Sequence, residues 1–223
     1  MRVLVHTANF RSFDDLVPYA PQQLPLGWQA DARIFSEATT LPRAMGPRLQ
    51  SRLAKMWAWE LTPGYDAYLW VDASCSLLHR ESVAWFLRQL KGYDCVLFRH
   101  PDRKTVREEA DFIRKKVLEG NKYLVDRYYG EDIDGQLRAV SDPGYTDDRL
   151  YASTVMAYFP TDRMQALMRD WWLHTTRYHL VDQLALPFLL WKHRCAVNVP
   201  DSRLYDCAYV THTRNHTFKK APR

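Results

Sequence analysis

Short apolar runs of strand length alternate with amphipathic runs of helix length along most of this chain, and this alternation constrains the fold more than any other feature. Strands are expected at residues 2–6, 32–35, 67–71, 95–98, 153–159 and 195–199, and helices after Gly46-Pro47, over 81–90, over about 105–119, from Asp162 and around Asp182. Strands separated by helices are typical of α/β proteins. We therefore predict one domain over residues 1–223, with a mostly parallel sheet flanked by helices and one antiparallel strand.

Residues 120–150 break this alternation, because they are polar and acidic and show no clear period. A stretch of this length without secondary structure is usually functional or mobile. We therefore expect an irregular loop there.

The balance of residue types is that of a folded, basic protein. Hydrophobic residues make up 47% of the sequence, and the formal net charge is +5 with a pI of about 9.0. A basic chain favours anionic ligands. Nucleic acid, nucleotide phosphates and acidic glycans all qualify, and total charge does not choose among them.

Cysteine usage and the apolar runs indicate a cellular setting. Cys75, Cys95, Cys195 and Cys207 form no C-x-x-C pair, which argues against a structural zinc site. Residues 1–6 are too short for the apolar core of a signal peptide. No apolar run reaches about 20 residues, the length of a membrane span. We expect a soluble, cytoplasmic protein.

The stretch Ala-Tyr-Leu-Trp-Val-Asp-Ala-Ser-Cys-Ser, residues 67–76, places a single acid, Asp72, at the end of a continuous apolar run. Such a run is typical of a strand buried on both faces, and α/β proteins bind ligands at the carboxyl ends of these strands. The alternative is that Asp72 caps a following helix, because Asp and Ser are favoured at that position.

Common nucleotide and hydrolase motifs are missing. The chain has only 8 glycines and contains neither G-x-G-x-x-G nor a P-loop, which argues against a dinucleotide-binding Rossmann site and a Walker NTPase. The G-x-S-x-G elbow of α/β-hydrolases and the H-E-x-x-H motif are absent as well.

Asp72 is therefore a candidate ligand for a divalent cation. Carboxylate oxygens bind Mg²⁺ and Mn²⁺, which also bind diphosphate oxygens. One carboxylate is too few, and the C-terminal tail offers the imidazoles of His212 and His216. Mn²⁺ tolerates this mixed ligation. The alternative for each histidine is a solvated surface position.

Several segments together resemble the GT-A fold of nucleotide-sugar glycosyltransferases, and in particular a family found in plants and bacteria that was first catalogued as a domain of unknown function. The matching segments are Leu69-Trp70-Val71-Asp72, Arg99-His100-Pro101-Asp102-Arg103, Arg107-Glu108-Glu109-Ala110 and Val181-Asp182-Gln183-Leu184. Their order and spacing agree over roughly residues 50–195. The chain departs from that family after Asp72, where it has Ala73-Ser74 in place of the common Gly-Lys.

The resemblance implies a metal-assisted transfer of a sugar from a nucleotide-diphosphate donor, with a UDP-sugar favoured, to a hydroxyl acceptor. Negative charge builds on the leaving phosphate in such a reaction and must be neutralised. Asp72, His212 and His216 would hold Mn²⁺ or Mg²⁺, with Ser74 binding through water. Lys219 would neutralise the diphosphate as a basic tail, from about residue 208 to the end, closes over the donor.

The same resemblance assigns further donor and acceptor positions. Thr7, Ala8 and Asn9 follow the first strand and are expected to contact the nucleoside. Lys55 lies on the helix before the Asp72 strand and is expected to reach the nucleotide, with a solvated surface position as the alternative. Asp182 is the candidate base that deprotonates the acceptor, and its alternative role is a helix cap.

The expected acceptor-binding residues are Arg99, His100, Arg103 and Gln183. Salt bridges from this basic cluster to Glu108 or Glu109 are an equally simple explanation.

Two other functions remain open from the sequence. A DNA-modifying glycosyltransferase acting on hydroxymethylated bases would also suit the basic charge and the aromatic content. A metal-dependent nuclease or nucleic-acid-binding module would need a cluster of carboxylates. The candidates for that cluster are Glu131, Asp132, Asp134, Asp142, Asp147 and Asp148.

Overall fold

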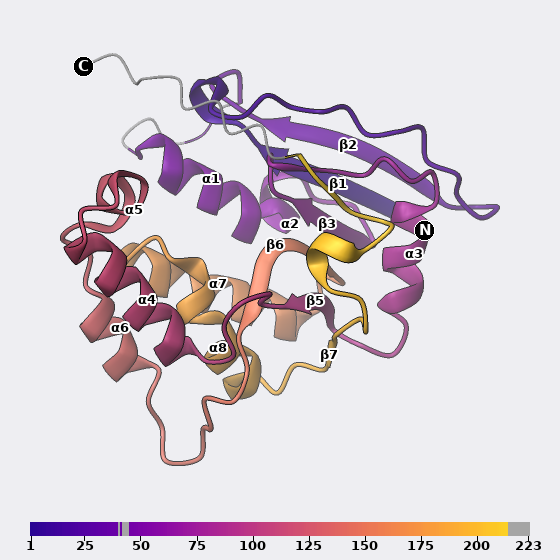
Figure 1. The fold of residues 1–223 in the computed structure, drawn as a ribbon. Coiled ribbons are helices and arrows are strands. Elements are labelled where there is room, and N and C mark those ends of the chain that lie inside the picture. The colour runs from indigo at the N-terminus through magenta and orange to yellow at the C-terminus, as the bar shows by residue number, and fades with distance from the viewer. Residues whose placement is uncertain (40, 42–44, 214–223) are drawn as a thin grey trace.

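The structure is a computed structural model that describes residues 1–39, 41 and 45–213. Its centre is a six-stranded sheet in the order β2-β1-β3-β6-β5-β7 (Figure 1). These strands are β1 (Arg2–Ala8), β2 (Gln29–Phe35), β3 (Ala67–Val71), β5 (Cys95–Arg99), β6 (Tyr151–Tyr158) and β7 (Val197–Asn198). A separate two-stranded sheet pairs β4 (Cys75–Ser76) with β8 (Thr211–His212).

Strand directions agree with the predicted class. β1 is parallel to both β2 and β3, and β5 is parallel to β7. β6 is antiparallel to its neighbours β3 and β5. The expected α/β architecture, with a mostly parallel sheet, one antiparallel strand and flanking helices, is therefore confirmed.

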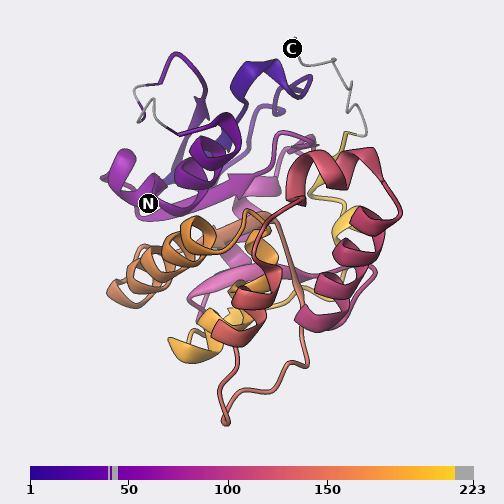
Figure 2. The ribbon, with the colours of Figure 1, turned by 90° about the vertical axis from the view of Figure 1, so that its left-hand side faces the viewer.

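Helices lie on both sides of the sheet. They are α1 (Pro47–Met56), α2 (Ala58–Leu61), α3 (Ser82–Gln89), α4 (Val106–Leu118), α5 (Lys122–Tyr128), α6 (Ile133–Ala139), α7 (Asp162–Arg177) and α8 (Leu186–Lys192), and three 3₁₀ turns are η1 (Phe10–Ser12), η2 (Asp182–Leu184) and η3 (Leu204–Asp206). Figure 2 shows α4, α5 and α6 as one group of helices beside the sheet. Within the described ranges, no helix is long and apolar enough to cross a membrane.

Two core clusters occupy opposite faces of the sheet, because successive strand residues point in opposite directions. Tyr68 of β3 packs in a cluster with Met168 of α7 and Leu189 of α8. Its neighbour Leu69 packs in the other cluster, with Phe86 of α3. β3 is buried along its whole length, as the apolar run predicts.

Local sequence signals explain several helix starts. Pro47 occupies the first turn of α1, where its missing N–H costs no hydrogen bond. The Thr105 side chain caps α4 by accepting from the Glu108 N–H at 3.0 Å, and the Glu108 carboxylate accepts from the Lys104 N–H. This arrangement matches the capping-box spacing read from the sequence.

The prediction of an irregular loop over 120–150 is wrong for much of that stretch, because α5 and α6 lie there. Each helix has a polar cap, with Asn121 accepting from the Leu124 N–H and Asp132 from the Gly135 N–H. Helices of 7 residues are too short to show a clear apolar period. The predicted helix around Asp182 is instead the 3₁₀ turn η2, and α8 begins only at Leu186.

Candidate functional site

Asp72 lies at the carboxyl end of β3 and continues its ladder, because its N–H donates to the Thr154 carbonyl of β6 at 2.8 Å. The next residues form a turn, closed by the Cys75 N–H donating to the Asp72 carbonyl, and then enter β4. No helix follows, so the alternative of a helix cap is wrong. The carboxylate Oδ1 accepts from Trp70 Nε1 at 2.6 Å, which fixes its orientation.

Asp182 comes from a distant part of the chain and lies near Asp72. Its carboxylate accepts from Lys55 Nζ at 2.7 Å and lies 3.5 Å from Arg52 Nε. Trp171 Nε1 donates to the Asp182 backbone carbonyl at 2.7 Å and anchors η2. The first residue of α8 is Leu186, so the alternative in which Asp182 caps that helix is also wrong.

The two carboxylates differ in their electrostatic setting. Burial raises the pKa of Asp72. The charges of Lys55 and Arg52 offset part of this rise, and the charge of Asp182 adds to it. Burial also opposes ionisation of Asp182, but Arg52 and Lys55 outweigh it and lower the pKa to about 2. The cations thus favour the ionised form of Asp182. Asp72 is the acid whose charge is more easily altered.

Three cations share one face of α1, because Arg48, Arg52 and Lys55 are spaced i, i+4 and i+7. Lys55 is 1% exposed, so the alternative of a solvated surface lysine is wrong. Arg48 reaches the group of helices beside the sheet, with its guanidinium 5.1 Å from the centre of the Tyr128 ring of α5. Of these three cations, only Lys55 is among the residues predicted from the sequence. The helical spacing of the two arginines was the signal that could have found them.

Thr7 and Ala8, expected to follow the first strand, are instead the last two residues of β1, and Asn9 comes directly after it at the same edge of the sheet. Thr7 is buried, and its hydroxyl has no hydrogen-bond partner within the described part of the chain. Ala8 is buried as well. The Asn9 side chain donates to the Asp14 carbonyl and accepts from the Asp14 N–H, so it holds the following loop.

That loop faces α5. The guanidinium of Arg127 lies 5.4 Å from the centre of the Phe13 ring and 4.0 Å from that of Tyr123. Figure 1 shows α5 near the start of α1. The stretch expected to be an irregular loop therefore supplies a helical wall beside the loop that follows β1.

Residues 211–213 return to the Asp72 turn. His212 is opposite Cys75 in the β4–β8 pairing, and its ring is 5.0 Å from that of Tyr205. Thr213 donates to the Ser74 carbonyl from both its N–H, at 2.8 Å, and its hydroxyl, at 2.9 Å. His216 and Lys219 lie outside the described residues.

The described side chains do not by themselves make a metal site. Across residues 1–39, 41 and 45–213, no group of three or more His, Cys, Asp and Glu side chains could hold an ion. Asp72 and His212 are at most part of a ligand set. We therefore derive no catalytic step through a metal.

Of the four predicted acceptor-binding residues, His100 and Arg103 form hydrogen bonds within the fold. Arg99 is exposed at the end of β5, and Gln183 is half-buried next to Asp182. His100 accepts at Nδ1 from the N–H groups of Asp102, at 3.2 Å, and Arg103, at 3.1 Å. Burial and then the charge of Arg103 lower the pKa of His100 to about 4.

Arg103 is also committed to the fold. Its Nε donates to the buried carboxylate of Glu109, and its guanidinium lies 4.1 Å from the centre of the Phe112 ring. The salt bridge to Glu109, raised from the sequence as an alternative to acceptor binding, is therefore present.

The acids of 131–148 serve the fold rather than one metal cluster. Four of them accept hydrogen bonds from backbone N–H groups: Glu131 from Leu180, Asp132 from Gly135, Asp142 from Gly144, and Asp147 from Val106 and Arg107. Asp134 accepts from the Arg114 side chain, and Asp148 pairs with Arg149. Their separate partners do not bring these carboxylates together as a two-metal nuclease would require.

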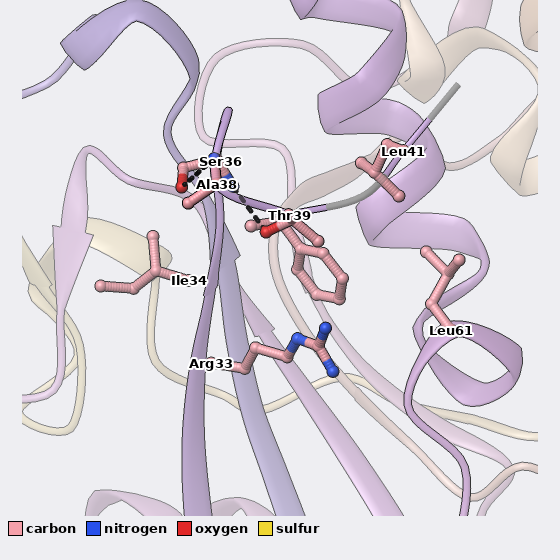
Figure 3. Close-up of a pocket in the computed structure, with 8 residues that line it drawn as sticks. Arg33, Ile34, Ser36, Ala38, Thr39, Leu41 and Leu61 are labelled. Carbon is pink, nitrogen blue, oxygen red and sulfur yellow. Dashed lines mark hydrogen bonds between the residues drawn. The ribbon is translucent and has the colours of Figure 1, made fainter. Parts of the chain in front are cut away.

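A pocket of about 320 Å³ opens at the carboxyl end of β2, and Figure 3 shows its lining. Thr39 Oγ1 accepts from the Ser36 N–H at 3.1 Å in its wall. Arg33 donates to Thr62 Oγ1 at 2.6 Å. Because Ala8, the last residue of β1, is opposite Phe35 in the β1–β2 register, this pocket adjoins the carboxyl end of β1.

Comparisons with known proteins show a likeness of fold but none of sequence. No protein-family model matches the sequence, and no curated protein is significantly similar to it. The fold is similar to the crystal structure of mouse xyloside xylosyltransferase 1 in its apo form, with a TM-score of 0.48 and 12% identity over 90% of this chain and 86% of that one. At this identity and TM-score the likeness says nothing about activity, and we infer function from the residues of this chain.

Proposed function

We propose that the protein is a glycosyltransferase that moves a sugar from a nucleotide-diphosphate donor to a hydroxyl acceptor. The observation that carries this proposal is the position of Asp72 at the carboxyl end of β3, with the Arg52–Lys55–Asp182 ion-pair group beside it. The carboxyl edge of a largely parallel sheet is the usual ligand site of α/β proteins. Cations at this edge would attract an anionic ligand, and the carboxylates beside them would help to orient it.

The cations of α1 suit the chemistry of the leaving group. Breaking the bond between the anomeric carbon and the diphosphate leaves negative charge on phosphate oxygens, and fixed positive charge stabilises that state. Arg52 and Arg48 carry guanidinium groups that can bind phosphate oxygens in pairs. Lys55 is already bound to Asp182, so it holds the cluster in place and adds positive potential.

The nucleoside would lie at the ends of β1 and β2. Thr7 supplies a buried hydroxyl that lacks a partner in the described part of the chain, and a polar ligand group would satisfy it. The adjoining pocket has room for a ring beside Phe35. A UDP-sugar is the donor we favour. Binding of Mn²⁺ or Mg²⁺ by Asp72, His212 and His216, and of diphosphate by Lys219, belongs to the same proposal.

The acceptor hydroxyl would approach from the side of η2 and the end of β5, with Gln183 and Arg99 as its nearest candidate contacts. His100 and Arg103 would shape this side through their contacts with the turn and with Glu109. A role for Asp182 as base requires acceptor binding to draw its carboxylate away from Lys55.

Thermal melting with UDP, GDP, CDP and TDP, each with and without Mn²⁺, tests the donor site. A nucleotide at about 100 times its dissociation constant stabilises the fold by about 2.7 kcal/mol, which raises the midpoint by several degrees. Asp72→Asn should abolish the shift. The exposed Asp201→Asn removes the same charge far from the β3 turn in sequence and should retain it.

Either of two results would overturn the proposal. One is the absence of a shift with any nucleotide and any nucleotide sugar. The other is a shift that Asp72→Asn leaves intact. A shift with duplex DNA alone would support the nucleic-acid alternatives instead.

A further inference from the structure

A second hollow is lined by residues of α4 and α6 and by Ser141, and Asp72 is not among them. It has a volume of about 580 Å³ and is shallow and open. We call it the α4–α6 hollow, and its lining residues are Arg107, Arg114, Asp134, Leu137, Arg138 and Ser141. Arg114 joins the two helices by donating to both Asp111 of α4 and Asp134 of α6.

Positive charge exceeds negative charge in this lining, with three guanidinium groups against one carboxylate. Arg114 is held in place by its two acids. Arg107 and Arg138 are exposed, and within the described part of the chain their guanidinium groups form no hydrogen bond or ion pair. Asp111 is spaced four residues from Arg107 on the same helix, but its carboxylate is bonded to Arg114. Two unpaired guanidinium groups thus face one hollow beside a third that is fixed.

The positive field comes from side chains rather than from a helix terminus. The first N–H groups of α4, those of Val106 and Arg107, already donate to the Asp147 carboxylate at 2.8 and 3.0 Å. Ser141 adds a hydroxyl, and Leu137 adds an apolar surface to the lining. The lining is mainly charged and polar, which suits a phosphate group rather than an apolar ligand.

The hollow is separate from the proposed donor site. The opposite face of α4 carries Val106, Ala110 and Ile113, which are buried in the core. The Asp72 group consists of Asp72, directly after β3, with Arg52 and Lys55 of α1 and Asp182 of η2. None of these residues lines the hollow. A ligand there would not compete for Arg52 or Lys55.

We propose that the α4–α6 hollow is a binding site for a phosphate group, either as the free anion or as a phosphate ester of a larger molecule. Guanidinium groups bind phosphate through paired, charge-assisted hydrogen bonds, and a doubly charged anion pairs with both Arg107 and Arg138 at once. Arg114, held by Asp111 and Asp134, adds a third guanidinium group to the lining. Binding supplies a counter-charge for Arg107 and Arg138, whose guanidinium groups form no ion pair within the described part of the chain.

The test is an NMR titration of the ¹⁵N-labelled protein with inorganic phosphate and, in a parallel arm, with glucose 6-phosphate. Both arms contain EDTA, so that no metal-dependent nucleotide site takes part. We expect saturable shifts of the Arg107 and Arg138 Nε–H signals and of backbone N–H signals in α4 and α6. Ester binding at least tenfold tighter than phosphate binding identifies an ester as the ligand, and equal binding identifies the free anion.

Two double variants make the test specific. Arg107→Gln with Arg138→Gln should weaken binding at least tenfold. Arg80→Gln with Lys91→Gln removes the same two charges from exposed positions flanking α3 and should leave binding unchanged. Shifts that do not saturate, or that survive the first double variant, would overturn the proposal. Asp72→Asn should not affect this binding, so the result is independent of the donor-site proposal.

Discussion

Lys55 and Asp182 lie 127 positions apart in the chain and form a buried ion pair, with 2.7 Å between Nζ and Oδ2. Lys55 also lies 5.5 Å from the centre of the Trp70 ring and 5.4 Å from that of Trp171. The pair thus joins α1 to η2 directly beside the end of β3. The strength of this ion pair therefore determines how firmly Lys55 and Asp182 are fixed beside Asp72.

Breaking this ion pair from one side should be costly. Asp182→Asn leaves the Lys55 ammonium buried without its counter-charge, and we expect a loss of about 3–5 kcal/mol in the free energy of unfolding. Replacing both partners, Lys55→Met with Asp182→Leu, should cost less than Asp182→Asn alone, because no unpaired lysine remains. Urea unfolding of the single and double variants measures the difference. A double variant as unstable as Asp182→Asn would contradict this explanation.

Acid should destabilise the fold, because His6 is buried in its neutral form. Burial lowers the pKa of His6 from 6.5 to about 3. Between these two pH values His6 is protonated in the unfolded chain but neutral in the native protein. The stability due to this difference is present above about pH 6.5 and is lost as the pH falls towards 3.

The variant His6→Leu removes that proton uptake. We expect the slope of unfolding free energy against pH to fall by up to about 1.4 kcal/mol per pH unit between about pH 6 and 4. Urea unfolding at a series of pH values measures the slope. Buried His179, whose pKa burial lowers to about 4, should maintain part of the slope in the variant. Equal slopes in the variant and the unaltered protein would refute the role of His6.

Trp70 should tune the charge of Asp72. The variant Trp70→Phe removes the Nε1 donor that lies 2.6 Å from Asp72 Oδ1, and this hydrogen bond favours the ionised carboxylate. We expect the pKa of Asp72 to rise further above its ordinary value. Titration of ¹³C-labelled aspartate carboxyl signals by NMR measures it. Trp85→Phe, which alters a tryptophan stacked on Tyr209, is the matched control and should leave the Asp72 signal unchanged.

The last described residue should hold the C-terminal segment against the Asp72 turn. Thr213→Val removes the hydroxyl donor to the Ser74 carbonyl but keeps the backbone one. A hydrogen bond of this kind contributes about 1 kcal/mol, so amide hydrogen exchange of residues 211–213 should speed up about fivefold. Thr176→Val removes a hydroxyl bonded within α7 and should not change that exchange. Unchanged exchange in Thr213→Val would show that other contacts hold the segment.

Elements with a strong local signal were predictable from the sequence. The buried run of 67–71 became β3, the Thr105 capping box started α4, and Pro47 started α1. Each signal depends on neighbours within a few residues, so it is visible without the fold. The short helices α5 and α6 were missed because 7 residues give too little periodicity, although Asn121 and Asp132 marked their starts.

The candidate site was only partly predictable, for a related reason. The sequence marks Asp72, Lys55 and Asp182 as site candidates, but it does not show that Lys55 and Asp182 form an ion pair beside Asp72. Whether a charged side chain is free or paired depends on which residues the fold brings within about 4 Å, and no sequence spacing reports that. Arg48 and Arg52 were not named, although their spacing from Lys55 placed all three cations on one helix face.

The sequence by itself determined the α/β class, the buried β3 and the acid at its end, because hydrophobic periodicity and caps are local properties of the chain. Tertiary structure alone decided the state of that acid and its partners. It buried Lys55, bound it to Asp182 and placed both beside Asp72, which raised the pKa of one carboxyl group and lowered that of the other. Charge interactions depend on distance and burial in three dimensions, so two similar aspartates in the sequence became different groups in the folded protein.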